Sequence, residues 1–209
     1  MPAIGELLRN LWGAWRLLLL DRHGILAYDG SRQAALRSFW VVLLSLPISA
    51  LTVALLLASG NEGLANGLAS LAADCTIAWL LPLLVIYALV RWYGRGERYW
   101  LLLTALNWSQ VPQGSLGLLR VGLLIGAGLL IGPDSAQDTA SASVLIGVAI
   151  VQLAWLVYIA IVFYEWFVAW IALEAGFALP TAAVLFDLVI NYGLSYGIDQ
   201  LWPPLPLAS

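Results

Sequence analysis

The sequence predicts an all-α fold, a polytopic membrane bundle of five transmembrane helices preceded by an amphipathic helix at the membrane interface. Composition is the first observation behind this prediction. Hydrophobic residues make up 62% of the 209 residues and charged residues only 10%, whereas a typical soluble domain is about 25% charged. The second observation is five apolar stretches long enough to cross a hydrocarbon core of about 30 Å, which takes about 20 helical residues. The composition therefore excludes a disordered chain and a secreted soluble scaffold.

Charge and cysteine content exclude further classes. The net charge is −3, and all nine basic residues are arginines. So few cations cannot neutralise a polyanion, so we expect no nucleic-acid partner. A single cysteine excludes an intramolecular disulfide and a cysteine-based metal cluster. Arginine in place of lysine, with abundant Ala, Leu and Gly, is typical of a GC-rich bacterial genome, which favours a bacterial inner-membrane protein.

The chain divides into three regions: residues 1–35, a cytoplasmic helix and linker; residues 36–202, the membrane domain; and residues 203–209, an external tail. In the first region, apolar side chains between positions 4 and 20 recur at helical spacing, and they include Trp12 and Trp15. Such a helix lies in the interface plane, with its tryptophans at the level of the lipid headgroups. We therefore expect membrane lipids to be its partner.

The membrane domain contains the five apolar tracts, which are Leu36–Ala58, Leu68–Val90, Tyr99–Gly132, Val144–Leu173 and Leu179–Leu201. The third tract is too long for one upright span, and a polar run interrupts it at Asn107, Ser109, Gln110, Pro112 and Gln113. Proline removes a backbone donor and clashes with the preceding turn, so we expect a short entry helix to Trp108 and a separate span from Pro112. Broken helices often line ion or substrate sites at membrane depth. A plain elbow near the interface is equally compatible with this polar run.

Arginine placement predicts the orientation. Five arginines precede the first span and three, Arg91, Arg95 and Arg98, follow the second, whereas the loops at 59–67 and 133–143 contain none. The positive-inside rule places the N-terminus and the Arg91–Arg98 loop in the cytoplasm and the C-terminus in the periplasm. We expect these arginines to contact anionic lipid headgroups.

Three ionisable residues lie within the apolar tracts: Arg120, Glu165 and Asp187. At 1.5 Å per residue each is predicted about 12 Å from the cytoplasmic end of its span, which places all three in one layer. Asn191 lies one turn after Asp187 on the same helix face. We expect the third and fifth spans to pack together, with Arg120 paired to Asp187. The layer is either a buried ion pair that fixes helix register or a proton or substrate relay, because charges at this depth are costly and often functional.

No catalytic motif is present in the sequence. It contains no Gly-x-Ser-x-Gly, no His-Glu-x-x-His and no phosphate-binding Gly-x-x-x-x-Gly-Lys pattern. We therefore expect a protein that is not an enzyme, with no catalytic residue, no cofactor and no metal site.

The predicted topology resembles that of the Yip1-type integral membrane proteins, which have a cytoplasmic N-terminal segment, five spans and an external C-terminus. The resemblance covers roughly Arg32 to Trp202. It includes the Arg91–Arg98 loop followed by Tyr99-Trp100, Asn107-Trp108-Ser109, and Phe186-Asp187 in the last span. It implies a non-enzymatic role in membrane organisation or trafficking. We therefore expect an accessory or scaffold protein that associates with lipids, with a membrane-protein partner or with itself as a homo-oligomer. The alternative is a small transporter or channel subunit that uses the charged layer.

Overall fold

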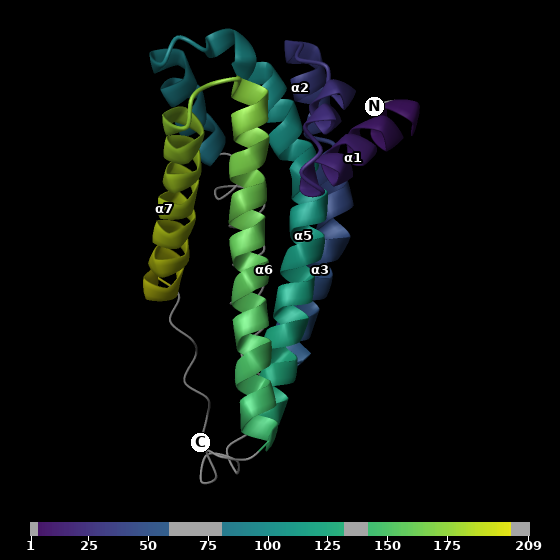
Figure 1. Cartoon of the computed structure of the whole chain (residues 1–209), viewed down its shortest axis with the longest axis vertical. Coiled ribbons are helices and arrows are strands. Elements are labelled where there is room, and N and C mark those ends of the chain that lie inside the picture. Colours follow the sequence, from purple (N-terminus) through teal and green to yellow (C-terminus); the bar gives the residue numbers. More distant parts are fainter. Residues whose placement is uncertain (1–3, 59–80, 132–141, 202–209) are drawn as a thin grey trace.

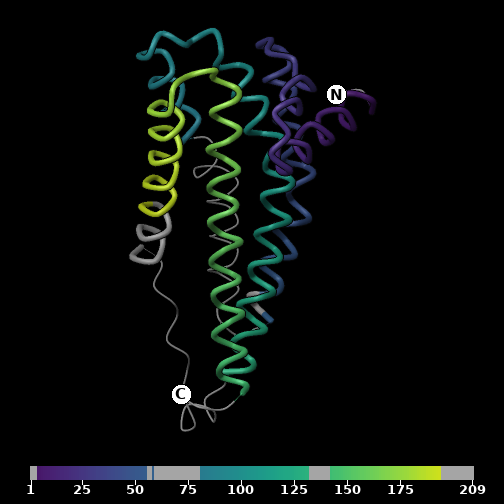
Figure 2. Tube along the Cα trace, in the orientation of Figure 1, coloured from purple at the N-terminus to yellow at the C-terminus, as the bar shows by residue number. Residues whose placement is uncertain are grey.

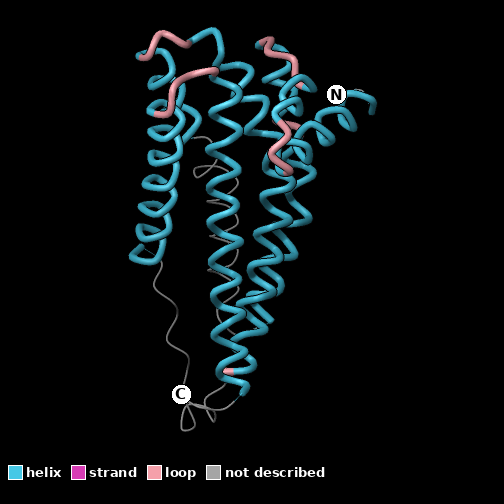
Figure 3. The backbone as a smooth tube through the Cα atoms, viewed as in Figure 1, coloured by secondary structure: helices cyan, strands magenta, loops and turns pink. Residues whose placement is uncertain are grey.

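The computed structural model describes residues 4–58, 81–131 and 142–201, and these residues form helices, turns and short connections without a strand (Figure 3). The helices are α1 (Ile4–Leu18), α2 (Arg32–Ser38), α3 (Val41–Ala58), α5 (Tyr99–Leu130), α6 (Ala142–Leu173) and α7 (Ala178–Leu201). A further helix covers Leu81–Trp92. Two short 3-10 helices, Arg22–Ala27 and Gly96–Arg98, join these elements. The all-α prediction is confirmed.

Three segments of the described chain are long and apolar enough to cross a membrane, namely Arg32–Leu55, Gly96–Leu130 and Ala142–Leu173. Two shorter apolar helices cover Leu81–Trp92 and Ala178–Gly193. The first part of the predicted second span and the predicted tail at 203–209 lie outside the described residues. The structure therefore bears out several apolar helices at the predicted positions.

The long helices α5 and α6 run side by side and form the centre of the bundle (Figures 1 and 2). Helix α3 packs along α5, and α7 packs on α6. The prediction that the third and fifth spans form the packed pair is wrong, because α6 lies between α5 and α7 (Figure 1). Apolar residues around most of its circumference let α6 pack on both neighbours.

The predicted break at Pro112 does not occur. Helix α5 is continuous over 32 residues from Tyr99 to Leu130, with Pro112 inside it and fully buried. The proline removes one backbone hydrogen bond, and a helix tolerates that loss where neighbouring helices and Ser or Thr side chains compensate. Ser109 Oγ and Ser115 Oγ donate to backbone carbonyls within α5, at 2.7 and 2.9 Å.

Helix α1 lies across one end of the bundle and contacts α5 and α6 (Figure 1). Its buried face consists of Asn10, Gly13, Ala14 and Leu17, whereas Trp12 and Trp15 of the predicted apolar face are exposed. The reason is steric, because small residues let α1 approach the 3-10 helix Arg22–Ala27 closely. A Cβ on Gly13 would lie 2.6 Å from Ala27 Cβ and 2.9 Å from the carbonyl oxygen of Gly24.

Candidate functional site: a polar cavity among the helices

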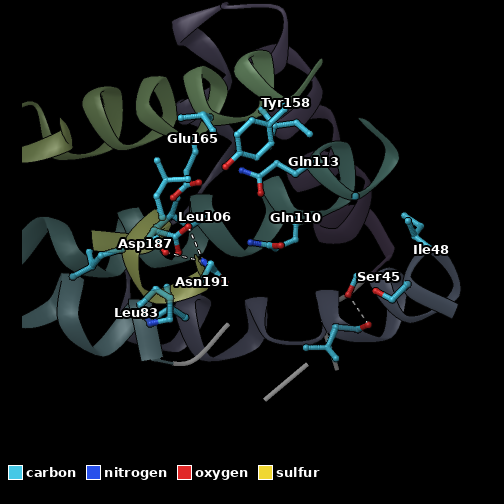
Figure 4. A pocket seen from close by; sticks show the side chains of 18 residues that line it. Ser45, Ile48, Leu83, Leu106, Gln110, Gln113, Tyr158, Glu165, Asp187 and Asn191 are labelled. Atoms are coloured by element: carbon cyan, nitrogen blue, oxygen red, sulfur yellow. Dashed lines mark hydrogen bonds between the residues drawn. The ribbon is translucent and has the colours of Figure 1, made fainter. Parts of the chain in front are cut away.

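A cavity of about 400 Å³ lies inside the bundle, between α3, the Leu81–Trp92 helix, α5, α6 and α7 (Figure 4). Most of its wall is aliphatic, as expected for helices of this composition. The polar lining that the described part of the chain supplies consists of eight residues from four of the helices: Ser45, Ser49, Gln110, Gln113, Tyr158, Glu165, Asp187 and Asn191. The structure therefore brings together residues that the sequence places in two separate groups, the charged layer and the polar run of the third tract.

Two carboxylates are the charged groups that the described residues contribute to this lining. Glu165 comes from α6 and Asp187 from α7, and both side chains extend into the same part of the cavity (Figure 4). Asn191 Nδ2 donates to Asp187 Oδ2 at 3.0 Å, across one helical turn. No hydrogen-bond donor or cation among the described residues pairs with the Glu165 carboxylate.

Amide groups from α5 form the facing wall. Gln110 and Gln113 both line the cavity, and Figure 4 shows them on the side opposite Asp187. The Gln113 Nε2 atom is buried and has no hydrogen-bond partner. Among the residues that the structure describes, the lining contains no Arg or His side chain. The cavity therefore combines oxygen ligands and amides with two acidic groups and no compensating cation.

Arg120 does not join this layer. Its guanidinium lies over the ring of Tyr158, at 5.1 Å from the centroid, and over Trp155 at 5.9 Å. Its Nε is buried without a hydrogen-bond partner. Both Arg120 and Asp187 belong to the described part of the chain, and they do not form the predicted ion pair. The depth prediction fails because it counts from a helix start at Pro112. Helix α5 begins at Tyr99 instead, which places Arg120 about 32 Å from the start of the helix.

Asn107 and Ser109 lie outside the cavity and stabilise helix packing. Both are fully buried. Asn107 Nδ2 donates to Ser38 Oγ at 2.7 Å, which joins α5 to α2. Ser109 Oγ donates to the carbonyl of Leu106 in its own helix. Of the five residues predicted at the helix break, only Gln110 and Gln113 reach the cavity.

The elements that carry the predicted interface residues lie toward one end of the bundle, with α1 on one side of it and the loop after Leu81–Trp92 on the other (Figure 1). Trp12 is 66% exposed, and Trp15 is exposed beside it. The arginines of the loop are partly engaged by protein groups. Arg98 forms an ion pair with Glu174, and Arg91 lies over the ring of Tyr87 at 5.9 Å. Arg95 is partly buried.

Polar contacts fix the turn after α1. Arg16 Nε donates to Asp21 Oδ2 at 2.7 Å, and the His23 backbone N–H donates to Asp21 Oδ1 at 2.9 Å. The His23 amide and the Arg16 guanidinium together lower the pKa of the Asp21 carboxyl to about 2. Helix α1 is also bonded to α6, because Tyr164 Oη donates to the carbonyl oxygen of Ala14 at 3.0 Å. These contacts hold α1 against the end of the bundle.

Sequence reasoning missed three polar residues of the cavity: Tyr158, Ser45 and Ser49. Tyr158 lies seven residues before Glu165, a spacing that puts both on one helix face. Ser45 and Ser49 are four residues apart in an otherwise apolar tract, which also marks one face. The signal was therefore present as helical spacing, but only the packed arrangement shows that these faces meet.

No protein-family model, curated protein or solved structure matches this chain. The functional argument therefore depends on the geometry and chemistry of the cavity.

Proposed function

We propose that this chain is a small transporter or channel subunit that binds a cation in the polar cavity. The observation that carries the proposal is the pair of acidic side chains, Glu165 and Asp187, in a cavity whose described lining residues include no basic side chain. A carboxylate in a low-dielectric bundle is costly unless a cation or hydrogen-bond donors compensate its charge. A bound proton or small cation supplies that compensation.

The donor set favours a monovalent or organic cation. The lining offers carboxylate, amide and hydroxyl oxygens, which are ligands for hard cations and acceptors for an ammonium group. Within the described chain, no group of three or more His, Cys, Asp or Glu side chains is arranged to hold a metal ion. A proton, an alkali cation or a protonated amine matches two acidic groups and neutral oxygens.

We further propose that all five apolar tracts cross a bacterial inner membrane, with the N-terminal helix and the Arg91–Arg98 loop on the cytoplasmic side. Helix α1 and this loop lie toward the same end of the bundle (Figure 1). This position supports the proposal, since the positive-inside rule assigns both segments to the cytoplasm. Helix α7 has 24 residues, or about 36 Å of helix, which exceeds the thickness of a bilayer core. Five spans are few for a carrier with paired repeats, so the transporting unit is a homodimer.

Flux in proteoliposomes tests the proposal. The probes are H⁺, Na⁺ and methylammonium, each measured against empty liposomes. We expect saturable flux of at least one probe, reduced at least tenfold by Asp187→Asn and by Glu165→Gln. Glu97→Gln is the matched control, because Glu97 is an exposed carboxylate in the loop before α5. Absence of flux for all three probes, or unchanged flux in both cavity variants, contradicts the proposal.

A second candidate is the membrane-organising or accessory role that the Yip1-type resemblance implies. The outward face of α1 favours it, because Ile4, Leu8 and Trp12 are all strongly exposed large apolar residues and such a face binds a membrane surface or a partner helix. The test is the mass of the intact particle, extracted in mild detergent through an N-terminal tag. A second protein at fixed stoichiometry supports this role. A homo-oligomer that carries only lipid or a small molecule favours the transporter.

A further inference from the structure

A second hollow, an apolar groove of about 510 Å³, lies between α6 and α7. Its lining includes Ile159 and Val162 of α6 and Leu185 and Leu188 of α7. The polar groups on its wall include the Thr181 hydroxyl, which donates to the Phe177 carbonyl and accepts from Trp166 Nε1. The groove therefore offers hydrocarbon contact and little further hydrogen bonding.

The groove and the polar cavity are adjacent. Tyr158, Val162 and Leu188 line both hollows. The hollow that holds the Glu165 and Asp187 carboxylates therefore borders the apolar groove at these three residues, between α6 and α7. Ile159 and Leu185, at the groove, are exposed on the outside of the bundle, so the groove opens toward the surroundings of α6 and α7. In a bilayer those surroundings are lipid chains.

We propose that the ligand is an amphiphilic amine, with its ammonium group between Glu165 and Asp187 and its alkyl chain in the α6–α7 groove. The inference rests on the proposed function and names the ligand class of the same site. An ammonium group has three donors and no acceptor, which suits two carboxylates and the amide oxygens. An alkyl chain gains affinity from each methylene that it buries in the groove. A phospholipid of the bilayer is a poorer match, because its phosphate would lie next to two carboxylates.

Binding in phosphatidylcholine nanodiscs tests the inference with three probes: decylamine, methylammonium and decanoate. Thermal unfolding of the protein is followed at increasing probe concentration, since a ligand of the folded state raises the unfolding temperature. All variants are measured in the same bilayer, so the partition of the probe into lipid is equal for each. We expect stabilisation by decylamine at lower concentrations than by methylammonium, and none by decanoate.

Variants that fill the groove separate the tail from the headgroup. Leu185→Trp places an indole in the groove, and Val189→Trp is its control, because Val189 is exposed one turn further along α7 and lines neither hollow. We expect Leu185→Trp to weaken decylamine binding at least tenfold, since each methylene that loses contact costs about fourfold in affinity. Methylammonium binding stays unchanged. If this variant does not fold, Ile159→Trp fills the groove from α6, with exposed Leu156→Trp as its control.

The outcomes separate the two proposals. Equal decylamine affinity in wild type and in a folded groove variant overturns the amphiphilic amine, and methylammonium binding that Asp187→Asn abolishes would still uphold the cation site. Decanoate binding that matches decylamine binding and is insensitive to Asp187→Asn means that the groove holds an alkyl chain only, which also overturns the inference. Loss of methylammonium and decylamine binding together in Asp187→Asn, with the groove effect limited to decylamine, supports both proposals.

Discussion

Substitution of Gly13 by alanine tests the close packing of α1 on the bundle. The added Cβ would lie 2.6 Å from Ala27 Cβ and 2.9 Å from the Gly24 carbonyl oxygen, and neither atom is at the end of a flexible side chain. Overpacking of this kind costs about 1–3 kcal/mol. Alanine also favours helix formation over glycine, but that gain is equal in the docked and undocked states if α1 remains helical. We therefore expect undocking of α1 to become about fivefold to about a hundredfold more frequent, at about tenfold per 1.4 kcal/mol.

Hydrogen exchange in nanodiscs, followed on the peptide that covers the 3-10 helix Arg22–Ala27, measures this change. The N–H groups of Gly24 and Tyr28 are hydrogen-bonded there, to Asp21 and Ile25, and their exchange increases when α1 leaves. The matched control is Gly5→Ala in the same helix, where the added Cβ has no atom within 4 Å. Exchange in Gly13→Ala that stays within twofold of wild type would refute the argument that this contact has no room for a methyl group.

Two further predictions concern charged residues. The effects of Arg120→Leu and Asp187→Leu on the free energy of unfolding should add within about 0.5 kcal/mol, because Arg120 contacts aromatic rings instead of Asp187. If each single mutant is destabilised and the double mutant is as stable as wild type, the two residues do form an ion pair and this prediction is wrong. The Asp21 carboxyl has a pKa of about 2 in the fold against its ordinary 3.8, so its contribution is complete above pH 4 and is lost as the pH falls toward 2. Exchange of the His23 amide, corrected for its intrinsic rate, should rise over that range in wild type and not in Asp21→Asn.

The positions of the helices were predictable because apolar length is a strong signal. Each helix longer than 15 residues in the described chain falls on a predicted tract, and α1 forms where apolar residues recur at helical spacing. A chain this apolar must satisfy its backbone groups internally, which in a membrane leaves helices as the simplest solution. Local pattern alone therefore accounts for the all-α fold.

The predictions that failed depend on contacts between distant segments. The sequence shows that α1 has an apolar face, but the structure buries Asn10 against Trp108, which lies far along the chain. With the Asn10 amide oriented by its partners, Oδ1 accepts from Trp108 Nε1 and Nδ2 donates to the Ala27 carbonyl, both at 3.1 Å. Pairing of this kind, across about a hundred residues of chain, has no periodicity to reveal it. The effect of Pro112 is similar, since tertiary packing decides whether a proline ends a helix or only removes one bond.

The displaced position of Arg120 determines the character of the cavity. In the predicted layer, one arginine would have neutralised one of two acids, and the remaining polar groups would have formed a closed ion-pair network. In the structure the guanidinium is held over Tyr158 and Trp155, where the faces of the rings attract it. Tyr158 also lines the cavity, so the guanidinium contacts a ring of the cavity lining without being part of that lining itself. The two carboxyl groups have no basic partner among the described residues of the lining, and this arrangement, more than the presence of acidic residues in the helices, favours a cation-binding site over an ion pair that only fixes helix register.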